Sequence, residues 1–228
     1  MTHLRLPYVE FVTLMAMLAA TVAFSIDSML PALPEIAAEL TPDTPNNAQG
    51  IIISFVIGMG VGTLFAGPLS DAYGRKKIML FGAALYIVAA AWAWRAEGLE
   101  EMFAARALQG LGAAGPRVAA VAMIRDLYSG RQMARLVSFV MIIFTIVPAI
   151  APSIGAVVIA FFGWRGLFIA FILFSLATIL WLGLRQAETR DPAHLVPFRP
   201  RRLWRALIEV LSHRQVMVAT AVQTLGYG

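Results

Sequence analysis

Cysteine is absent from this chain of 228 residues, and only 14% of its residues are charged. Without thiols, the chain cannot form disulfides, bind zinc through cysteine or carry out thiol catalysis. An average soluble domain has about 25% charged residues, so this chain also lacks the polar surface that a soluble protein presents to water. Its few histidines (His3, His194 and His213) lie outside the apolar runs. We therefore expect no metal centre and no intramembrane enzyme.

Apolar residues make up 60% of the sequence, which indicates an all-α integral membrane protein. The hydrocarbon core of a bilayer is about 30 Å thick, and a helix needs about 20 mostly apolar residues to span it. The first run is longer than a signal-peptide core, so we expect it to be retained as an anchor. Six runs meet the length requirement: Tyr8–Leu30, Gln49–Leu69, Ile78–Trp94, Leu99–Ile124, Leu136–Phe162 and Gly166–Leu184.

The runs predict three parts: a six-helix bundle over 1–184, a basic linker over 185–214, and the start of a seventh transmembrane helix over 215–228. Within the linker, Leu203–Leu211 has the period of an amphipathic helix that lies on the membrane surface. The last part would be only about 21 Å long as a helix, too short to span comfortably. A terminal helix at the membrane interface is the alternative interpretation of that segment.

The basic residues lie mainly in the gaps between apolar runs, on one side of the expected membrane. A sequence pI near 10.1 can indicate nucleic-acid binding, but that function needs a basic face with stacking aromatics, so we expect no nucleic-acid partner. Alternate gaps instead hold 14 and 2 of the 18 Lys and Arg residues. The positive-inside rule then places the richer side and the N-terminus in the cytoplasm, as in a multi-pass protein of the cell inner membrane.

A glycine-rich string, G-P-L-S-D-A-Y-G-R-K-K, separates the second and third runs. Its glycines allow a tight turn and close helix approach, and its carboxylate can cap a helix or pair with an arginine. The string resembles the cytoplasmic loop signature of the major facilitator superfamily of transporters, with Ala72 where that family usually has a basic residue. The candidate gating residues of this loop are Gly67, Asp71, Gly74, Arg75 and Lys76.

The fourth run contains Arg106-Ala-Leu-Gln109-Gly, similar to the R-x-x-Q-G signature of the proton-coupled members of that superfamily. An arginine in hydrocarbon costs at least about 2.5 kcal/mol, so it should face a cavity or a partner. Asp27, the one carboxylate well inside a run, is expected in the same outer third of the membrane. A sheltered carboxylate opposite a guanidinium is suited to take up and release protons. A fixed structural bridge, or an Asp27 at the outer interface, is the alternative.

Arg117 follows Arg106 by eleven residues, which brings it to within about 20° of the same helix face. Together with Gln109, the two arginines are predicted to form a polar stripe along an aqueous path. Arg117 lies nearer the cytoplasmic end, where Glu10 or solvent could satisfy it. The alternative is that the Arg117 side chain snorkels towards the inner membrane surface and has no role in such a path.

Two proline patterns narrow the resemblance to one subgroup of that superfamily. The D-x-x-L-P-x-L-P order that begins at Asp27 is similar to the first helix of the Bcr/CflA-type drug antiporters. The fifth run resembles the antiporter motif through Pro148, Pro152 and Gly155, although Ala151 stands where glycine is typical. Prolines four residues apart are expected to kink this helix, because each removes a backbone hydrogen bond.

The resemblance implies the N-terminal half of a proton-coupled multidrug exporter. Such transporters have two six-helix halves, with substrate bound between them. The implied partners are the lipid bilayer, small hydrophobic or cationic drug-like substrates, and either a missing C-terminal half or a second copy of the chain. The proton would be the coupling ion, and no other cofactor is expected. Two alternatives stay open: a truncated or non-transporting membrane module, and a half-transporter that works only as a parallel dimer.

Overall fold

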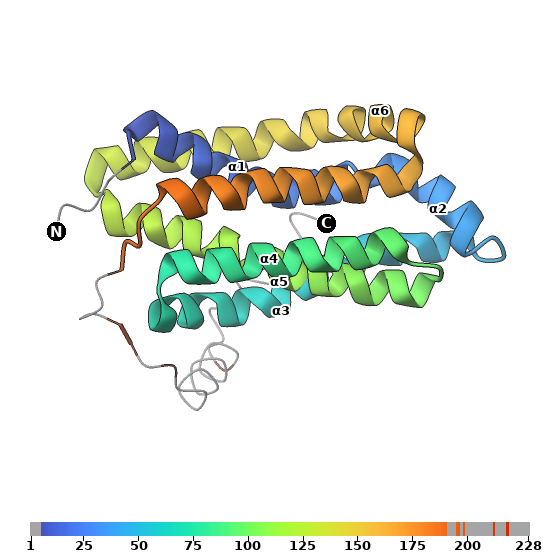
Figure 1. The fold of residues 1–228 in the computed structure, drawn as a ribbon, viewed down its shortest axis with the longest axis horizontal. Helices are drawn as coiled ribbons and strands as arrows, with labels where there is room; N and C mark the ends of the chain where they lie inside the picture. Colours follow the sequence, from blue (N-terminus) through green and yellow to red (C-terminus); the bar gives the residue numbers. More distant parts are fainter. Residues whose placement is uncertain (1–5, 191–194, 197, 199–211, 213–217, 219–228) are drawn as a thin grey trace. The chain divides into compact units, whose positions relative to one another are not determined.

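The computed structural model describes residues 6–190, 195, 196, 198, 212 and 218, and the regular structure among them is helical. The chain divides into a unit of residues 1–195 and a second unit of residues 196–228. The predicted amphipathic segment and the predicted start of a seventh helix lie outside the described residues. The fold below is therefore that of the first unit (Figure 1).

The first apolar run forms helix α1 (Tyr8–Asp27), which is followed by a 3-10 turn η1 (Leu30–Ala32) and a short helix α2 (Leu33–Leu40). The sequence predicted one helix to Leu30. The break comes earlier because Pro31 and Pro34 lack backbone N–H donors, and each stands in the first turn of a new helix, where that donor is not needed. Asp27 therefore ends α1 instead of lying within a continuous helix.

The second and third runs form α3 (Gly50–Tyr73), preceded by the 3-10 turn η2 (Pro45–Gln49), and α4 (Arg75–Arg95). The expected cytoplasmic loop between them shrinks to Gly74, because the helices extend beyond the apolar runs into the polar residues of the motif. Gly74 has φ 100°, a value that favours glycine. Gly67 and Asp71 consequently belong to the last two turns of α3.

The fourth run forms α5 (Leu99–Leu127), and the fifth and sixth runs form α6 (Gly130–Arg185). Within α6 the backbone leaves helical geometry at Gly163 (φ 67°), where the chain reverses, so α6 consists of two arms side by side (Figure 1). The reversal falls in the predicted gap between the two runs. Pro148 and Pro152 lie inside the first arm without such a break, so the sharp change of direction lies at the glycine.

Helix α5 is packed closely against both α3 and α4 through glycines. A Cβ atom added at Gly110 would lie 2.0 Å from the backbone oxygen of Phe55 in α3, and one at Gly112 would lie 2.5 Å from the backbone nitrogen of Tyr86 in α4. Small residues permit this approach of helix backbones in membranes. On α3, Gly58 lies against α5 in the same way, whereas Gly60 has open space.

Five helices of the described region are long and apolar enough to cross a membrane, and one of them is the folded-back α6. Large hydrophobic side chains are exposed along α3, α4 and both arms of α6, for example Ile57, Phe81, Ile146 and Leu180. Such surface is stable against lipid and unfavourable against water. The described region is an all-helical, multi-pass membrane fold.

Candidate functional site

Arg106 is fully buried in the centre of the bundle, with 0% of its surface exposed. Its Nη2 donates to the backbone oxygen of Ser25 in α1 at 3.0 Å, and its Nη1 donates to Oε1 of Gln109 at 2.8 Å. The guanidinium also lies over the ring of Phe55, 4.5 Å from the centroid. Its Nε has no hydrogen-bond partner within the described part of the chain. The charge is thus held by a carbonyl, an amide and an aromatic face.

Asp27 lies on the same stretch of α1 that Arg106 contacts, two residues after Ser25. The direct Asp27–Arg106 pair expected from the sequence is not formed here: no ion pair joins these two described residues, and the guanidinium binds the α1 backbone instead. The reason is geometric, since the carbonyl of Ser25 reaches the buried arginine while Asp27 is half-buried at the end of the helix.

Two hydroxyls next to Arg106 were missed by the sequence analysis. Ser25 and Tyr86 are buried, and their hydroxyl groups are hydrogen-bonded to each other across α1 and α4. Ser25 Oγ also contacts the backbone oxygen of Thr21 at 2.7 Å. The sequence did contain a signal for this pair, because each hydroxyl-bearing residue lies within a run that is otherwise mostly apolar. Together with Arg106 and Gln109 they form a buried polar cluster.

Arg117 occupies a different environment from Arg106. Its side chain is exposed on α5, with Nη1 3.4 Å from Sδ of Met59 and the guanidinium 5.9 Å from the ring centroid of Phe144. The suggestion that Glu10 satisfies it is wrong. Glu10 accepts two hydrogen bonds from Arg185 at 2.9 Å and one from the indole of Trp181 at 3.0 Å.

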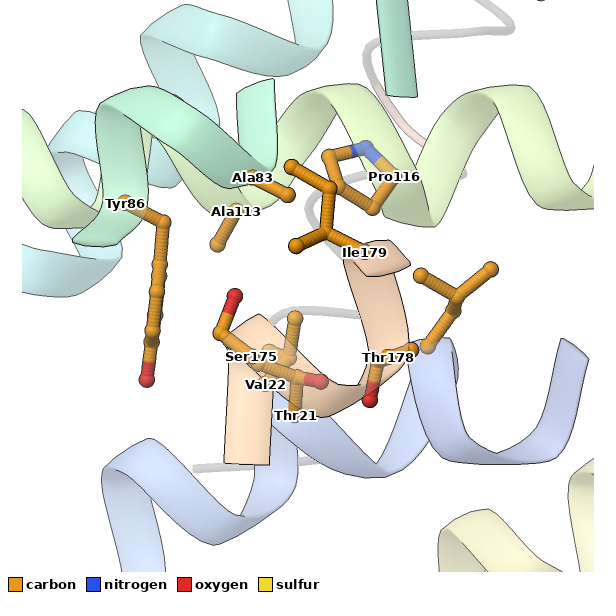
Figure 2. A pocket seen from close by; sticks show the side chains of 10 residues that line it. Thr21, Val22, Ala83, Tyr86, Ala113, Pro116, Ser175, Thr178 and Ile179 are labelled. Carbon is orange, nitrogen blue, oxygen red and sulfur yellow. The ribbon is translucent and has the colours of Figure 1, made fainter. Parts of the chain in front are cut away.

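Two open spaces in the described part of the bundle are lined by Arg117. An open groove of about 520 Å³ is lined by residues of α3 and α5, including Gly67, Asp71 and Arg117, and a cavity of about 170 Å³ lies between α1, α5 and the first arm of α6. By contrast, the space between α1, α4, α5 and the second arm of α6 amounts to about 10 Å³ (Figure 2). That is room for about one water molecule. Of these three spaces, the two wide ones are lined by Arg117.

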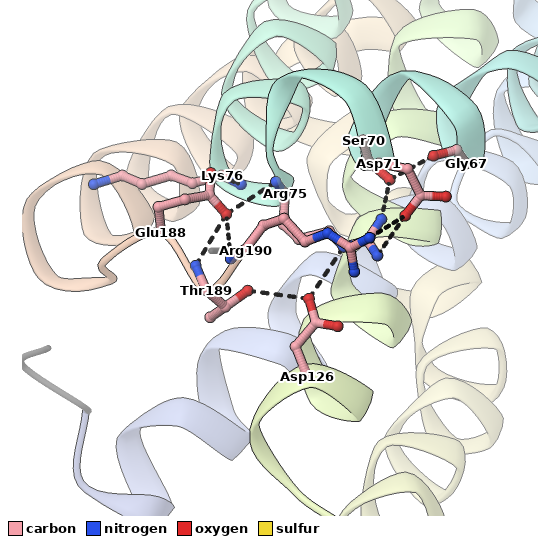
Figure 3. Close-up of polar contacts among 9 residues, drawn as sticks. All are labelled: Gly67, Ser70, Asp71, Arg75, Lys76, Asp126, Glu188, Thr189 and Arg190. Atoms are coloured by element: carbon pink, nitrogen blue, oxygen red, sulfur yellow. Dashed lines mark hydrogen bonds and ion pairs between the residues drawn. The ribbon is translucent and has the colours of Figure 1, made fainter. Parts of the chain in front are cut away.

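The motif around Gly74 is an ion-pair network at one end of the bundle (Figure 3). Arg75 is 2.6 Å from Asp71 and 3.2 Å from Asp126 of α5, and its Nη1 donates to Ser70 Oγ at 2.6 Å. Its side chain is 7% exposed. One nearly buried guanidinium with two carboxylates joins the end of α3 to the end of α5. Asp126 was not singled out in the sequence.

Glu188, which follows α6, was also missed. Its carboxylate accepts hydrogen bonds from the backbone N–H groups of Arg75 and Lys76, both at 3.0 Å, and so caps the first turn of α4 (Figure 3). Lys76 reaches in the opposite direction and donates to the backbone oxygen of Gly183 at 2.8 Å. Only the fold brings this acidic residue of the linker to the motif.

The antiporter-like segment packs against the end of α1. A Cβ added at Gly155 would lie 2.4 Å from the backbone oxygen of Ser28, next to Asp27. Pro148 and Pro152 precede this contact on the same arm and are partly buried. The structure therefore places the glycine of this motif against the residue that follows Asp27.

Comparisons with known proteins agree with this architecture. The family model described as Major Facilitator Superfamily matches residues 13–228. The chain is 28% identical over 218 residues to a "Bicyclomycin resistance protein homolog" of Haemophilus influenzae, which covers 96% of this chain and 54% of that protein. It is 33% identical over 195 residues to "Multidrug resistance protein MdtL" of Escherichia coli, with coverages of 86% and 50%.

Two solved structures share the fold. The human organic anion transporter MFSD10 superposes with a TM-score of 0.69 at 16% identity, over 87% of this chain and 53% of that one. The proton:xylose symporter XylE gives a TM-score of 0.69 at 14% identity, over 77% and 44%. The chain spans about half the length of the curated relatives it matches. Six helical arms, the motif network at Gly74 and the family match lead to one conclusion: this chain belongs to the major facilitator superfamily, whose members are transporters and not enzymes.

Proposed function

We propose that this chain supplies half of a proton-coupled drug exporter, in which drug leaves the cell as protons enter. The relatives named for drug resistance support this class of substrate. We further propose that it lies in the cell inner membrane with its N-terminus in the cytoplasm, as the distribution of Lys and Arg favours.

The observation that carries the proposal is the fully buried guanidinium of Arg106, which is bonded to the α1 backbone two residues before Asp27, a carboxylate with no ion pair among the described residues. A charge buried at membrane depth has a high free-energy cost, and such charges typically mark functional sites. Proton binding by Asp27 would change the charge next to the backbone that Arg106 holds. A movement of α1 relative to α5 would then be coupled to protonation, with Gln109 as the second support of the guanidinium.

The network at Gly74 is proposed to govern closure at the cytoplasmic end. Arg75 joins α3 to α5 through Asp71 and Asp126, so opening at that end requires the nearly buried guanidinium to separate from two partly exposed carboxylates, or all three groups to move as one body. At the other end, Gly155 allows α6 to seal against α1. Both features support alternating access to the groove that Arg117 lines.

Replacing Asp27 with Asn tests the coupling. The chain is reconstituted into proteoliposomes whose interior is more acidic than the bath, and uptake of labelled bicyclomycin, the compound in one relative's name, is measured. The unmodified chain is expected to accumulate the compound, whereas D27N is expected to lose gradient-driven uptake and still insert. The matched control is Asp43→Asn, an exposed aspartate outside the bundle's polar cluster. Undiminished uptake by D27N would contradict the assignment.

A second copy of the chain is the alternative source of the opposite wall of the groove. The α3 face that borders the groove includes Thr63, which is exposed. Because the chain has no cysteine, Thr63→Cys allows disulfide cross-linking between copies in membranes. Cross-linked copies with flux support the parallel dimer, and a monomer without flux supports a non-transporting module.

A further inference from the structure

The cavity beside Arg117 has the size and lining of a small-molecule subsite. It measures about 170 Å³ and is lined by nine residues, of which Arg117 is the one polar side chain and Met15, Ala120, Val140 and Phe144 are representative apolar ones. An apolar cavity of about 150 Å³ is large enough to take benzene. This cavity can therefore hold one aromatic ring.

The guanidinium at the edge of this cavity has no carboxylate partner among the described residues. It contacts the sulfur of Met59 and lies near the ring of Phe144. It lies within a helix that is long and apolar enough to span the membrane. An arginine there needs water, an anion or other polar groups beside it, and Arg117 lacks the carbonyl and amide partners that Arg106 has among the described residues.

The groove next to the cavity has an excess of positive charge. Its lining includes Arg75, Arg117 and Arg125 against Asp71 and Asp126. Both carboxylates are paired with Arg75, and Asp71 lies 4.0 Å from Arg190 as well. Neither is left to neutralise Arg117, so a cation that entered this region would be repelled and an anion attracted.

We propose that this cavity is a substrate subsite for acidic aromatic compounds, with the ring among the α1, α5 and α6 side chains and the acidic group paired with Arg117. The inference rests on the proposed function and specifies its substrate class. The sequence favoured hydrophobic or cationic substrates, whereas this cavity favours acidic aromatic ones. Arginine binds a carboxylate through two parallel hydrogen bonds, which a neutral or cationic head group cannot reproduce.

The test uses three compounds with one ring and different head groups: 3-phenylpropionate, 3-phenylpropanol and 3-phenylpropylammonium. Their binding to the full chain in phosphatidylcholine nanodiscs is measured by calorimetry. The carboxylate is expected to bind at least about tenfold more tightly than the alcohol, and the ammonium most weakly. Arg117→Gln is expected to remove the difference between carboxylate and alcohol while leaving the affinity for the alcohol unchanged.

Three further variants separate charge, shape and folding. Arg117→Lys keeps the charge and loses the planar fork, so it should retain a reduced preference for the carboxylate. Ala120→Leu fills the cavity and should weaken all three compounds together. Arg95→Gln, an arginine at the far end of α4 that contacts Trp94, should leave every affinity unchanged.

Anionic lipid is the other source of an acidic group in a membrane. Full affinity for 3-phenylpropionate in nanodiscs that also contain phosphatidylglycerol supports the subsite. Loss of that binding would assign Arg117 to the lipid head group and overturn the proposal, as would a carboxylate preference that survives Arg117→Gln or tightest binding of the ammonium. Because the readout is binding, a chain without proton-driven flux can still show the predicted order, so the two proposals fail separately.

Discussion

At the scale of single residues, two arginines of α5 that share a helix face by spacing are stabilised in different ways. Arg106 is fully buried and bonded to protein oxygens, whereas Arg117 is exposed beside a groove and a cavity. The difference follows from their neighbours, because α1 packs against one and open space lies beside the other. The first is suited to a structural and coupling role and the second to a ligand.

Tyr86→Phe tests the buried polar cluster. Removal of the phenolic hydroxyl deletes the hydrogen bond to Ser25, which keeps a bond to the backbone oxygen of Thr21. Loss of one such bond is expected to lower the free energy of unfolding by about 1 kcal/mol. Denaturation of the purified protein in mild detergent, followed by circular dichroism, measures the change. An unchanged unfolding midpoint would show that the hydroxyl contributes nothing to stability.

Gly155→Ala tests the contact between α6 and α1. The added methyl group would lie 2.4 Å from the backbone oxygen of Ser28, so the two helices must separate. We expect a loss of about 1–3 kcal/mol in the free energy of unfolding, as for other overpacked sites. Gly60→Ala in α3 is the matched control, since nothing lies within 4 Å of the added atom. It should be neutral or stabilising, because alanine favours helices.

At the scale of helices, the end of α6 and the start of α4 are joined in both directions. Glu188 accepts hydrogen bonds from two N–H groups of α4, and Lys76 donates to a carbonyl group of α6. These are the backbone groups that a helix end leaves without internal partners. The contact holds the beginning of the linker against the Gly74 motif.

Glu188→Gln tests this connection. The amide has one acceptor oxygen where the carboxylate has two, and it carries no charge to favour the helix N-terminus. We expect faster hydrogen exchange at the first turn of α4 and a cost of about 1 kcal/mol. Glu97→Gln, at the opposite end of α4, serves as the control and should leave that turn unchanged. Equal protection in both variants would argue against the cap.

At the scale of the whole molecule, the bundle has two chemically distinct ends. The Gly74 end holds the network of Arg75, Asp71 and Asp126. The Gly163 end is joined by Arg165, which binds Glu39 of α2 at 2.6 Å and the backbone oxygen of Ala96 at 3.1 Å. The helices between them expose mainly apolar side chains.

Cysteine labelling in inner-membrane vesicles tests the orientation of these ends. Because the chain has no native cysteine, single substitutions at Asp43 and Ser129, both exposed and at opposite ends of the bundle, report without background. A membrane-impermeant maleimide added outside intact inner-membrane vesicles of native orientation should label Asp43→Cys and spare Ser129→Cys. The reverse pattern would overturn the cytoplasmic N-terminus. Labelling of both after detergent treatment is the control for accessibility.

The predicted spans correspond closely to the helices of the structure, because length and hydropathy dominate helix formation in a bilayer. The gap before Gly166 coincides with the reversal at Gly163, and the run that starts at Leu99 coincides with the start of α5. Ends were less predictable where polar residues extend a helix, as at Tyr73. The amphipathic linker helix and the seventh helix remain predictions.

Composition, apolar run lengths and the ordered motifs were enough, by themselves, to establish a membrane-spanning member of a transporter superfamily and to single out Asp27, Arg106 and Arg75. The partners of these residues were decided only by tertiary packing. Ser25 and Glu188 reach their arginine or helix end across 81 and 113 positions of sequence. No local pattern encodes such contacts, because they depend on which helix faces pack together and how closely glycine lets them approach.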